Sequence, residues 1–133
     1  MKEILDFLSK NRFGNLATCD HTIPDTRPME AVFHTEEGIF FYTSTQEDLA
    51  NQLKANQNIC FCATDSEYNY VKVKGAVKFS EQVAHKKSIM EKSVFANKVF
   101  HESNLETMLV FYLPSETAMM HLHNRNELKT ASF

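Results

Sequence analysis

Tryptophan is absent from this chain of 133 residues, and glycine, proline and cysteine occur only three times each. Three glycines are too few for a glycine-rich phosphate-binding loop, and the nucleophile-elbow, zinc-protease, P-loop and dinucleotide-binding motifs do not occur. Cys19, Cys60 and Cys62 form neither an even set nor a CxxC pair. We therefore expect no disulfide framework and a reducing, cytoplasmic environment.

Long apolar runs and clusters of positive charge are also missing. The longest apolar runs, such as residues 108–113, are far shorter than the roughly 20 residues that cross a bilayer. Acids interrupt the apolar pattern at the N-terminus, so we expect neither a membrane span nor a signal peptide. Lys and Arg number 14 against 17 Asp and Glu, a formal net charge of -3. We expect no nucleic acid and no membrane among the partners of this chain.

Aromatic residues are plentiful by contrast, with eleven Phe and four Tyr among 43% hydrophobic residues. This length and composition predict a single domain, residues 1–133, with one aromatic core. Apolar residues at helical spacing predict helices over 2–10, 46–56 and 81–99.

Runs rich in β-branched and aromatic residues, bounded by turn signals, predict the strands. These runs are 15–20, 26–35, 39–44, 59–66, 68–80 and, as two or three strands, 107–128. We expect the first three to form a meander, with Gly38 in a turn that suits a positive φ, and a hairpin turn at 124–126. The pattern predicts a mainly β protein with α (α+β), a small antiparallel barrel with two to three flanking helices.

Three hydroxyl residues, Thr43, Ser44 and Thr45, stand between a predicted strand and a predicted helix. Ser44 and Glu47 match the capping box, in which a hydroxyl and an acid satisfy backbone N–H groups at the start of a helix. Free hydroxyls beside a helix N-terminus also suit a dianionic phosphate. The two interpretations are compatible, because one hydroxyl can cap the helix while the others bind.

Arg27 is one of three arginines and lies mid-strand beside Pro28, which cannot donate to a sheet ladder. This pair indicates either an edge-strand arginine that faces water or a contact with an anion or a flavin.

Two histidines, His121 and His123, share one face of a predicted strand. Together with Cys60 or Cys62 they are possible metal ligands, but the sequence shows no third and fourth ligand at a spacing typical of a metal site. We therefore predict no metal.

The order of these segments resembles the FMN-binding split-barrel proteins of the pyridoxamine 5'-phosphate oxidase-like superfamily. The resemblance covers residues 13–79 well and the remainder more loosely. It depends on a "LAT" strand, a turn with proline, "RP", an acidic turn before Gly38, "FYTS" and "QLKAN" before an apolar strand. The combination is specific, although each piece alone is weak.

This resemblance implies a six-stranded antiparallel split β-barrel and a homodimer with two FMN sites at the subunit interface. It implies an FMN-dependent oxidoreductase whose small-molecule substrate and electron donor are unassigned. The alternative is a non-catalytic flavin- or haem-binding, or stress-related, split-barrel dimer, with His121 or His123 as the haem ligand.

The family's FMN contacts map onto nine positions of this chain. They are Arg27, Pro28, Met29, Tyr42, Thr43, Ser44, Thr45, Gln52 and Lys74. By the resemblance, the arginine element contacts the flavin, and the strand end and helix start hold the ribityl phosphate. The glutamine lies near the ring or ribityl chain, and the lysine comes from the second subunit.

The chain departs from the family pattern at two places. Many relatives carry a lysine or arginine in the first turn of the helix after the hydroxyls, where this chain has Glu47 and Asp48. Either these acids point away, and Arg27 or a lysine across the dimer balances the phosphate, or FMN binds weakly. Residues 121–133 lack the arginine-rich ending of true pyridoxamine phosphate oxidases, so vitamin B6 oxidation is not the predicted activity.

Overall fold

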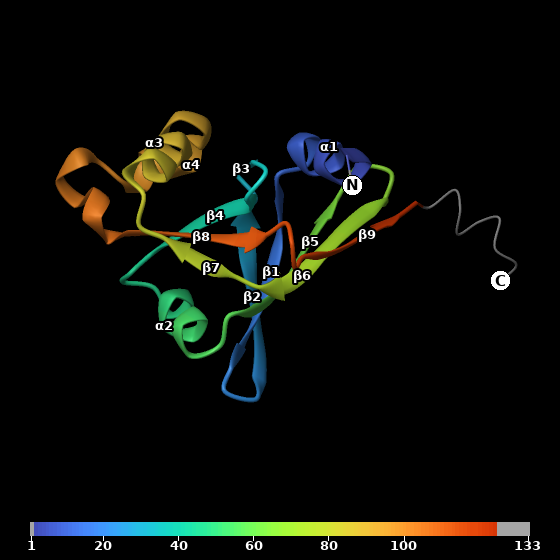
Figure 1. Cartoon of the computed structure of the whole chain (residues 1–133), viewed down its shortest axis with the longest axis horizontal. Helices are drawn as coiled ribbons and strands as arrows, with labels where there is room; N and C mark the ends of the chain where they lie inside the picture. Colours follow the sequence, from blue (N-terminus) through green and yellow to red (C-terminus); the bar gives the residue numbers. More distant parts are fainter. Residues whose placement is uncertain (1, 125–133) are drawn as a thin grey trace, which may run out of the picture.

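Two antiparallel sheets share one core in the computed structural model, which describes residues 2–124 (Figure 1). The strands are β1 (Phe13–Asp20), β2 (Ile23–Glu30), β3 (Phe33–His34), β4 (Gly38–Ser44), β5 (Asn58–Thr64), β6 (Tyr70–Ala76), β7 (Lys78–Ser80), β8 (Met108–Pro114) and β9 (Met119–His123). The helices are α1 (Lys2–Lys10), α2 (Asp48–Ala55), α3 (Val83–Lys92), α4 (Val94–Val99) and the 3₁₀ helix η1 (Glu102–Thr107). The sheet orders are β2-β1-β5-β6-β9 and β3-β4-β8-β7.

The predicted fold class is confirmed: strands dominate, pairing is antiparallel, and helices flank the sheets. The count of six strands was approximate, because nine are present within residues 2–124. Helix α1 confirms the first predicted helix. The predicted turn at 124–126 extends past the described residues. Within the described part of the chain, none of the helices is long and apolar enough to cross a membrane.

The predicted strand 26–35 is broken, and the predicted meander is wrong. Strand β2 pairs with β1 in the five-stranded sheet, whereas β3 pairs with β4 in the other sheet. Between them, the N–H of Ala31 donates to the Arg12 carbonyl (2.7 Å) and that of Val32 to the Phe40 carbonyl (3.0 Å). Both side chains are buried. The apolar residues 31–33 do not reveal in sequence that the chain changes sheets here.

Two further predicted elements are interrupted. Residues 68–80 form β6 and β7, and the predicted helix 81–99 forms α3 and α4 on either side of Ser93. The Ser93 hydroxyl accepts from the Ala96 N–H (3.1 Å), so this residue caps α4. Helix α4 borders the pocket described below, together with β2 and β4.

The core lies between the two sheets and is aromatic, as predicted. Phe41, Phe61 and Phe111 are fully buried, with ring centroids 5.2 Å (Phe41–Phe61) and 5.4 Å (Phe41–Phe111) apart. A second cluster lies between the other face of β4 and β8 and helices α3 and α4. Gly38 has φ +158°, and a Cβ there would lie 2.1 Å from the Leu113 carbonyl oxygen. Glycine therefore permits the close approach of β4 and β8.

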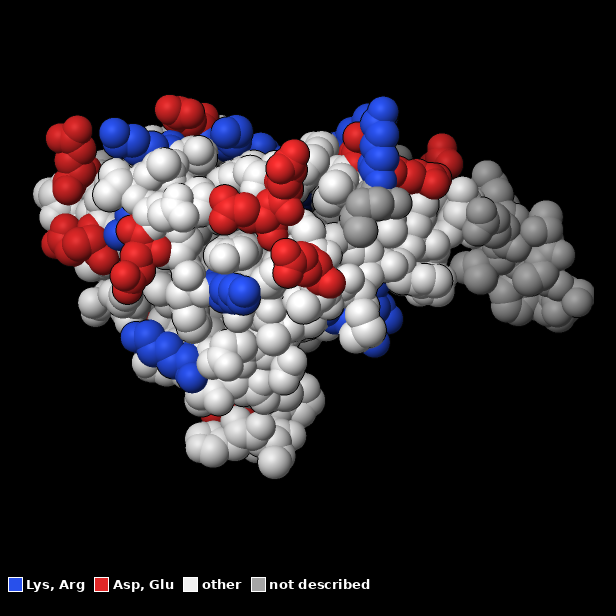
Figure 2. All heavy atoms as spheres, viewed as in Figure 1, with Lys and Arg blue, Asp and Glu red and all other residues white. Residues whose placement is uncertain are grey.

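Acidic and basic side chains are interspersed over the face seen in Figure 2, without an extended patch of one sign in that view. Side chains alternate along β5 and β6: apolar ones point inward, and Cys60, Cys62, Lys72 and Lys74 point to the outer face of the five-stranded sheet.

Candidate functional site

A pocket of about 420 Å³ lies where the ends of β2 and β4 meet helix α4. Its lining residues are Phe13, Pro28, Met29, Glu30, Tyr42, Thr43, Ser44, Glu47, Phe95, Val99 and Phe100. Five of the nine predicted cofactor residues are thus gathered in one place by two strands that belong to different sheets. The volume is within the range of about 300–1,000 Å³ that is typical of small-molecule sites.

One side of this pocket is an apolar wall that remains open to solvent. The rings of Phe13 and Phe95 meet edge to face at 5.4 Å, yet each is about half exposed, at 54% and 52%. Val99 is 58% exposed. Exposed apolar side chains that surround a hollow are typical of a site that receives a flat apolar ligand or a partner.

The other side of the pocket carries hydroxyls, but these do not cap the helix. The Ser44 hydroxyl accepts from the Gln46 N–H (3.1 Å), and the Ser44 carbonyl accepts from the Glu47 N–H (3.0 Å). Helix α2 begins at Asp48, and Glu47 occupies the N-cap position without a side-chain cap bond. The predicted capping box is therefore wrong, because a local serine turn competes with the cap for the same hydroxyl. The O–H hydrogen of Ser44 stays available for a ligand.

Arg27 lies outside this pocket, in a polar network with Thr18, Asp25 and Gln52. Its Nη1 donates to the Leu16 carbonyl (3.2 Å) and Thr18 Oγ1 (2.7 Å). Its Nη2 donates to Asp25 Oδ2 (2.9 Å) and Gln52 Oε1 (3.0 Å). The Gln52 amide also donates to Asp25 Oδ2 (2.9 Å).

This network pairs Asp25 with Arg27, both on β2, and ties them to Thr18 of β1 and Gln52 of α2. The hydrogen bond from Gln52 and then the charge of Arg27 lower the pKa of the Asp25 carboxyl, although burial opposes them. Arg27 is half-buried and its guanidinium is committed to these partners. A flavin contact by Arg27 or Gln52 stays a prediction.

Thr45 and Lys74 are likewise not among the lining residues. Thr45 is exposed, and its N–H donates to the Thr107 carbonyl (2.8 Å). Lys74 is on β6, which β1 and β5 separate from β2 in the sheet. It borders a different hollow, of about 350 Å³, with His121 and His123. Within one chain Lys74 therefore does not reach the first pocket.

A buried acid in the pocket, Glu30, was not predicted from the sequence. It is 5% exposed; its Oε2 lies 2.8 Å from Arg12 Nη2, and its Oε1 accepts from the Ser93 hydroxyl (2.6 Å). The Tyr42 hydroxyl lies 3.5 Å from Ser93 Oγ. Because the Ser93 hydrogen is used on Glu30, Tyr42 is the donor in that weak contact.

Burial raises the pKa of the Tyr42 phenol; its bond to Ser93 opposes the change and the charge of Glu30 adds to it. The phenol is therefore a neutral donor at physiological pH. Arg12, Glu30 and Ser93 are distant in sequence, and the only available signal was a single acid within the apolar run "PMEAVF".

The two antiparallel sheets around one core, with a concave site where strands of both sheets end, define an antiparallel split β-barrel protein. A family model described as "Pyridoxamine 5'-phosphate oxidase" matches residues 1–113. The chain therefore belongs to this family. A sequence search of curated proteins finds no significant match.

Solved structures share the fold at low sequence identity. A NimC/NimA family protein from Clostridium acetobutylicum has a TM-score of 0.74 at 17% identity, covering 92% of each chain. General Stress Protein 26 from Bacillus anthracis has a TM-score of 0.71 at 18% identity, again covering 92% of each chain. The FAD and haem binding protein from Mycobacterium smegmatis has a TM-score of 0.69 at 10% identity, covering 99% of this chain and 78% of the other. These similarities concern the fold.

Proposed function

We propose that this chain is an FMN-dependent oxidoreductase that binds the flavin in the 420 Å³ pocket and works as a homodimer on a small-molecule substrate. The observation that carries the proposal is the convergence of Pro28, Met29, Tyr42, Thr43 and Ser44 on that pocket. Bound FMN supplies the redox chemistry, and the protein supplies position, electrostatics and exclusion of water.

The shape and polarity of the pocket fit FMN. Pro28, Phe95 and Phe100 offer apolar surface for a flat ring system, and Tyr42 offers a neutral phenol. Thr43 and Ser44 lie at the other side, where hydroxyl hydrogens and backbone N–H groups suit phosphate oxygens.

The described lining residues of this pocket include no positive charge for a phosphate. Its described lining includes two acids, Glu30 and Glu47, and neither lysine nor arginine. Arg12 balances Glu30, but Glu47 has no ion-pair partner among residues 2–124. Because Arg27 is committed to Asp25 and Gln52, a lysine of a second copy is the favoured counter-charge for the phosphate.

The outer face of the five-stranded sheet is the surface that suits such a second copy. Its strands present Ala17, Cys60, Lys74 and Met119 in one cross-strand row, and all four side chains are exposed or half-exposed. A sheet face with apolar and small residues needs a cover. In the proposed dimer, this face packs against the same face of the second copy. Lys74 of each chain then provides the positive charge for the FMN phosphate that is bound to the other chain.

An FMN titration tests the proposal. We expect the purified protein to carry flavin absorbance or to acquire it with added FMN. At 100 times the dissociation constant, FMN stabilises the protein by about 2.7 kcal/mol. For a chain of this size the melting temperature then rises by about 10 °C.

Ser44→Ala should reduce the rise, whereas Ser66→Ala, at an exposed turn, should not. A colourless protein with an unmoved melting temperature contradicts FMN binding, and a monomeric mass by light scattering contradicts the dimer.

Haem binding without turnover is the second candidate, favoured by the paired histidines of β9. The His121 and His123 rings lie 4.2 Å apart beside the 350 Å³ hollow. Burial, then the charges of His121 and Lys72, lower the pKa of His123, which keeps its imidazole neutral and able to ligate iron. The name of the Mycobacterium smegmatis protein includes both FAD and haem.

A haem titration distinguishes this candidate from the first. If it is correct, added haem produces a Soret band that His121→Ala or His123→Ala abolishes. His21→Ala is the matched control, because His21 lies exposed in the β1–β2 turn. A Soret band that persists in both β9 variants contradicts this site.

A further inference from the structure

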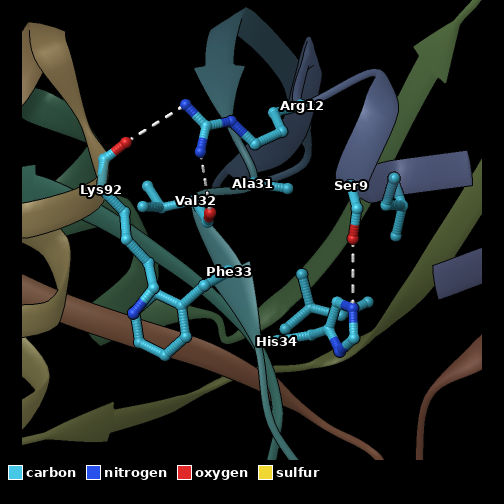
Figure 3. A pocket seen from close by; sticks show the side chains of 9 residues that line it. Ser9, Arg12, Ala31, Val32, Phe33, His34 and Lys92 are labelled. Carbon is cyan, nitrogen blue, oxygen red and sulfur yellow. Dashed lines mark hydrogen bonds between the residues drawn. The ribbon is translucent and has the colours of Figure 1, made fainter. Parts of the chain in front are cut away.

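A second pocket, of about 210 Å³, lies between the end of α1, strand β3 and the end of α3 (Figure 3). Its lining residues are Leu8, Ser9, Arg12, Ala31, Val32, Phe33, His34, Ile39 and Lys92. It has no lining residue in common with the proposed flavin pocket. The Arg12–Glu30 ion pair lies between them, with Arg12 lining this pocket and Glu30 the other.

The floor of this second pocket is apolar and belongs to the rigid core. Leu8, Ala31, Val32 and Ile39 are each less than 5% exposed. The chain crosses between the two sheets at Ala31 and Val32, so sheet packing fixes this floor. Such a surface accepts the hydrocarbon part of a small molecule.

The rim of the second pocket is basic, and none of its described lining residues is acidic. Arg12 Nη1 donates to the Val32 carbonyl (3.5 Å), and Nη2 lies within bonding distance of the Lys92 carbonyl (3.2 Å) and of Glu30. Of the five guanidinium N–H groups, the one on Nε and one on Nη1 have no partner among residues 2–124. These two donors are available to a ligand.

The lining residues of the second pocket, taken with Glu30, sum to one positive charge when His34 is neutral. Glu30 balances Arg12, while the Lys92 ammonium is 5.0 Å from the centre of the Phe33 ring, a cation–π contact that holds it at the rim. Ser9 donates to the Leu5 carbonyl (3.0 Å) and accepts from His34 Nε2 (3.2 Å), as Figure 3 shows for the second contact. That bond fixes the imidazole at the opposite side of the pocket.

We propose that this second pocket binds a small organic monoanion of the carboxylate class, with its short hydrocarbon chain on the buried floor. One uncompensated positive charge matches a carboxylate rather than a dianionic phosphate. The volume is below the range of about 300–1,000 Å³ for drug-sized ligands, so the ligand is small. Arg12 and Lys92 hold the carboxylate, and Leu8, Val32 and Ile39 contact the chain.

Butyrate is the probe for this site, titrated at constant ionic strength and followed by melting temperature. We expect saturable stabilisation by butyrate and none by 1-butanol or butylamine. Acetate should bind more weakly, by about fourfold for each missing CH₂ group. Lys92→Met keeps the apolar part of the side chain and removes its charge. It should weaken butyrate binding about fivefold, because the ion pair between the carboxylate and the exposed Lys92 ammonium is a weak one. Lys87→Met, on the same helix but outside the pocket, should have no effect.

Amide chemical shifts provide an independent location for the bound butyrate. The N–H signals of Val32, Phe33 and His34 should move with the same dissociation constant, while those of Tyr42 and Ser44 at the flavin pocket should not. Equal stabilisation by 1-butanol or by sodium chloride overturns the proposal. Unchanged butyrate affinity in Lys92→Met, or shifts confined to other parts of the chain, also overturn it. These readouts need no FMN, so the outcome is independent of the proposed flavin function.

Discussion

Replacing Arg12 by methionine is expected to lower the free energy of unfolding by about 3 kcal/mol. The substitution leaves the Glu30 carboxylate without its counter-charge, although its side chain is only 4% exposed. The estimate is at the low end of the usual 3–5 kcal/mol, because the Arg12 side chain is itself 32% exposed. Urea unfolding at neutral pH, with a constant m value, measures the loss. Lys10→Met, an exposed change at the end of α1, is the control and should cost less than about 0.5 kcal/mol.

A double variant separates the ion pair from simple packing. Arg12→Met combined with Glu30→Met removes both charges, so we expect it to recover most of the lost stability. The Ser93 hydroxyl loses one partner but still accepts from Ala96, which keeps the start of α4 in place. If the double variant is as unstable as Arg12→Met alone, lost packing rather than an unpaired buried charge explains the effect.

Replacing Glu47 by lysine is expected to tighten FMN binding roughly 30-fold. The change removes a negative charge from the rim of the flavin pocket and adds a positive one. Each charge about 4 Å from the phosphate contributes about 1 kcal/mol in an exposed site, and about 2 kcal/mol in total corresponds to that factor. Fluorescence titration with FMN measures the affinity, and Glu47→Gln should give about half of the gain in free energy.

Glu36→Lys is the control for Glu47→Lys, since it makes the same charge change at an exposed turn outside the pocket. Unchanged affinity in Glu47→Lys would mean that the Glu47 carboxylate points away from the phosphate. Absence of FMN binding in every variant would instead contradict the proposed cofactor itself. Higher salt should reduce the gain, because the interaction is between exposed charges.

Local patterns predicted much of this fold correctly. Helix α1 and strands β4, β5 and β8 follow from the spacing of their apolar residues, and the inward–outward alternation in β6 was visible in its valines and lysines. The resemblance to a known family located Pro28, Met29, Tyr42, Thr43 and Ser44, which share one pocket. The helix and the strands depend on neighbours within a few residues, so the order of residues is enough to specify them, whereas the pocket joins strands of different sheets.

Other features depend on contacts between distant segments. The guanidinium of Arg27 donates to Thr18 of β1 and to Gln52 of α2, which are 9 and 25 residues away in sequence. The break at Ser93 arises where its hydroxyl both caps α4 and donates to Glu30, which is 63 residues away in sequence. A pattern of apolar and polar positions contains no information about such pairings.

The sequence alone determined the class of this protein: a mainly β fold with an aromatic core and a hydroxyl-rich strand end, because side-chain periodicity and turn chemistry act locally. Only the tertiary structure decided where the chain changes sheets, which charges are paired and where the pockets lie. Ala31 and Val32 appear as ordinary strand residues in sequence, yet the chain changes sheets at these two buried residues, and Glu30, directly before them, pairs with Arg12. Burial of a charge is stable only with its partner, and that partner is supplied by folding.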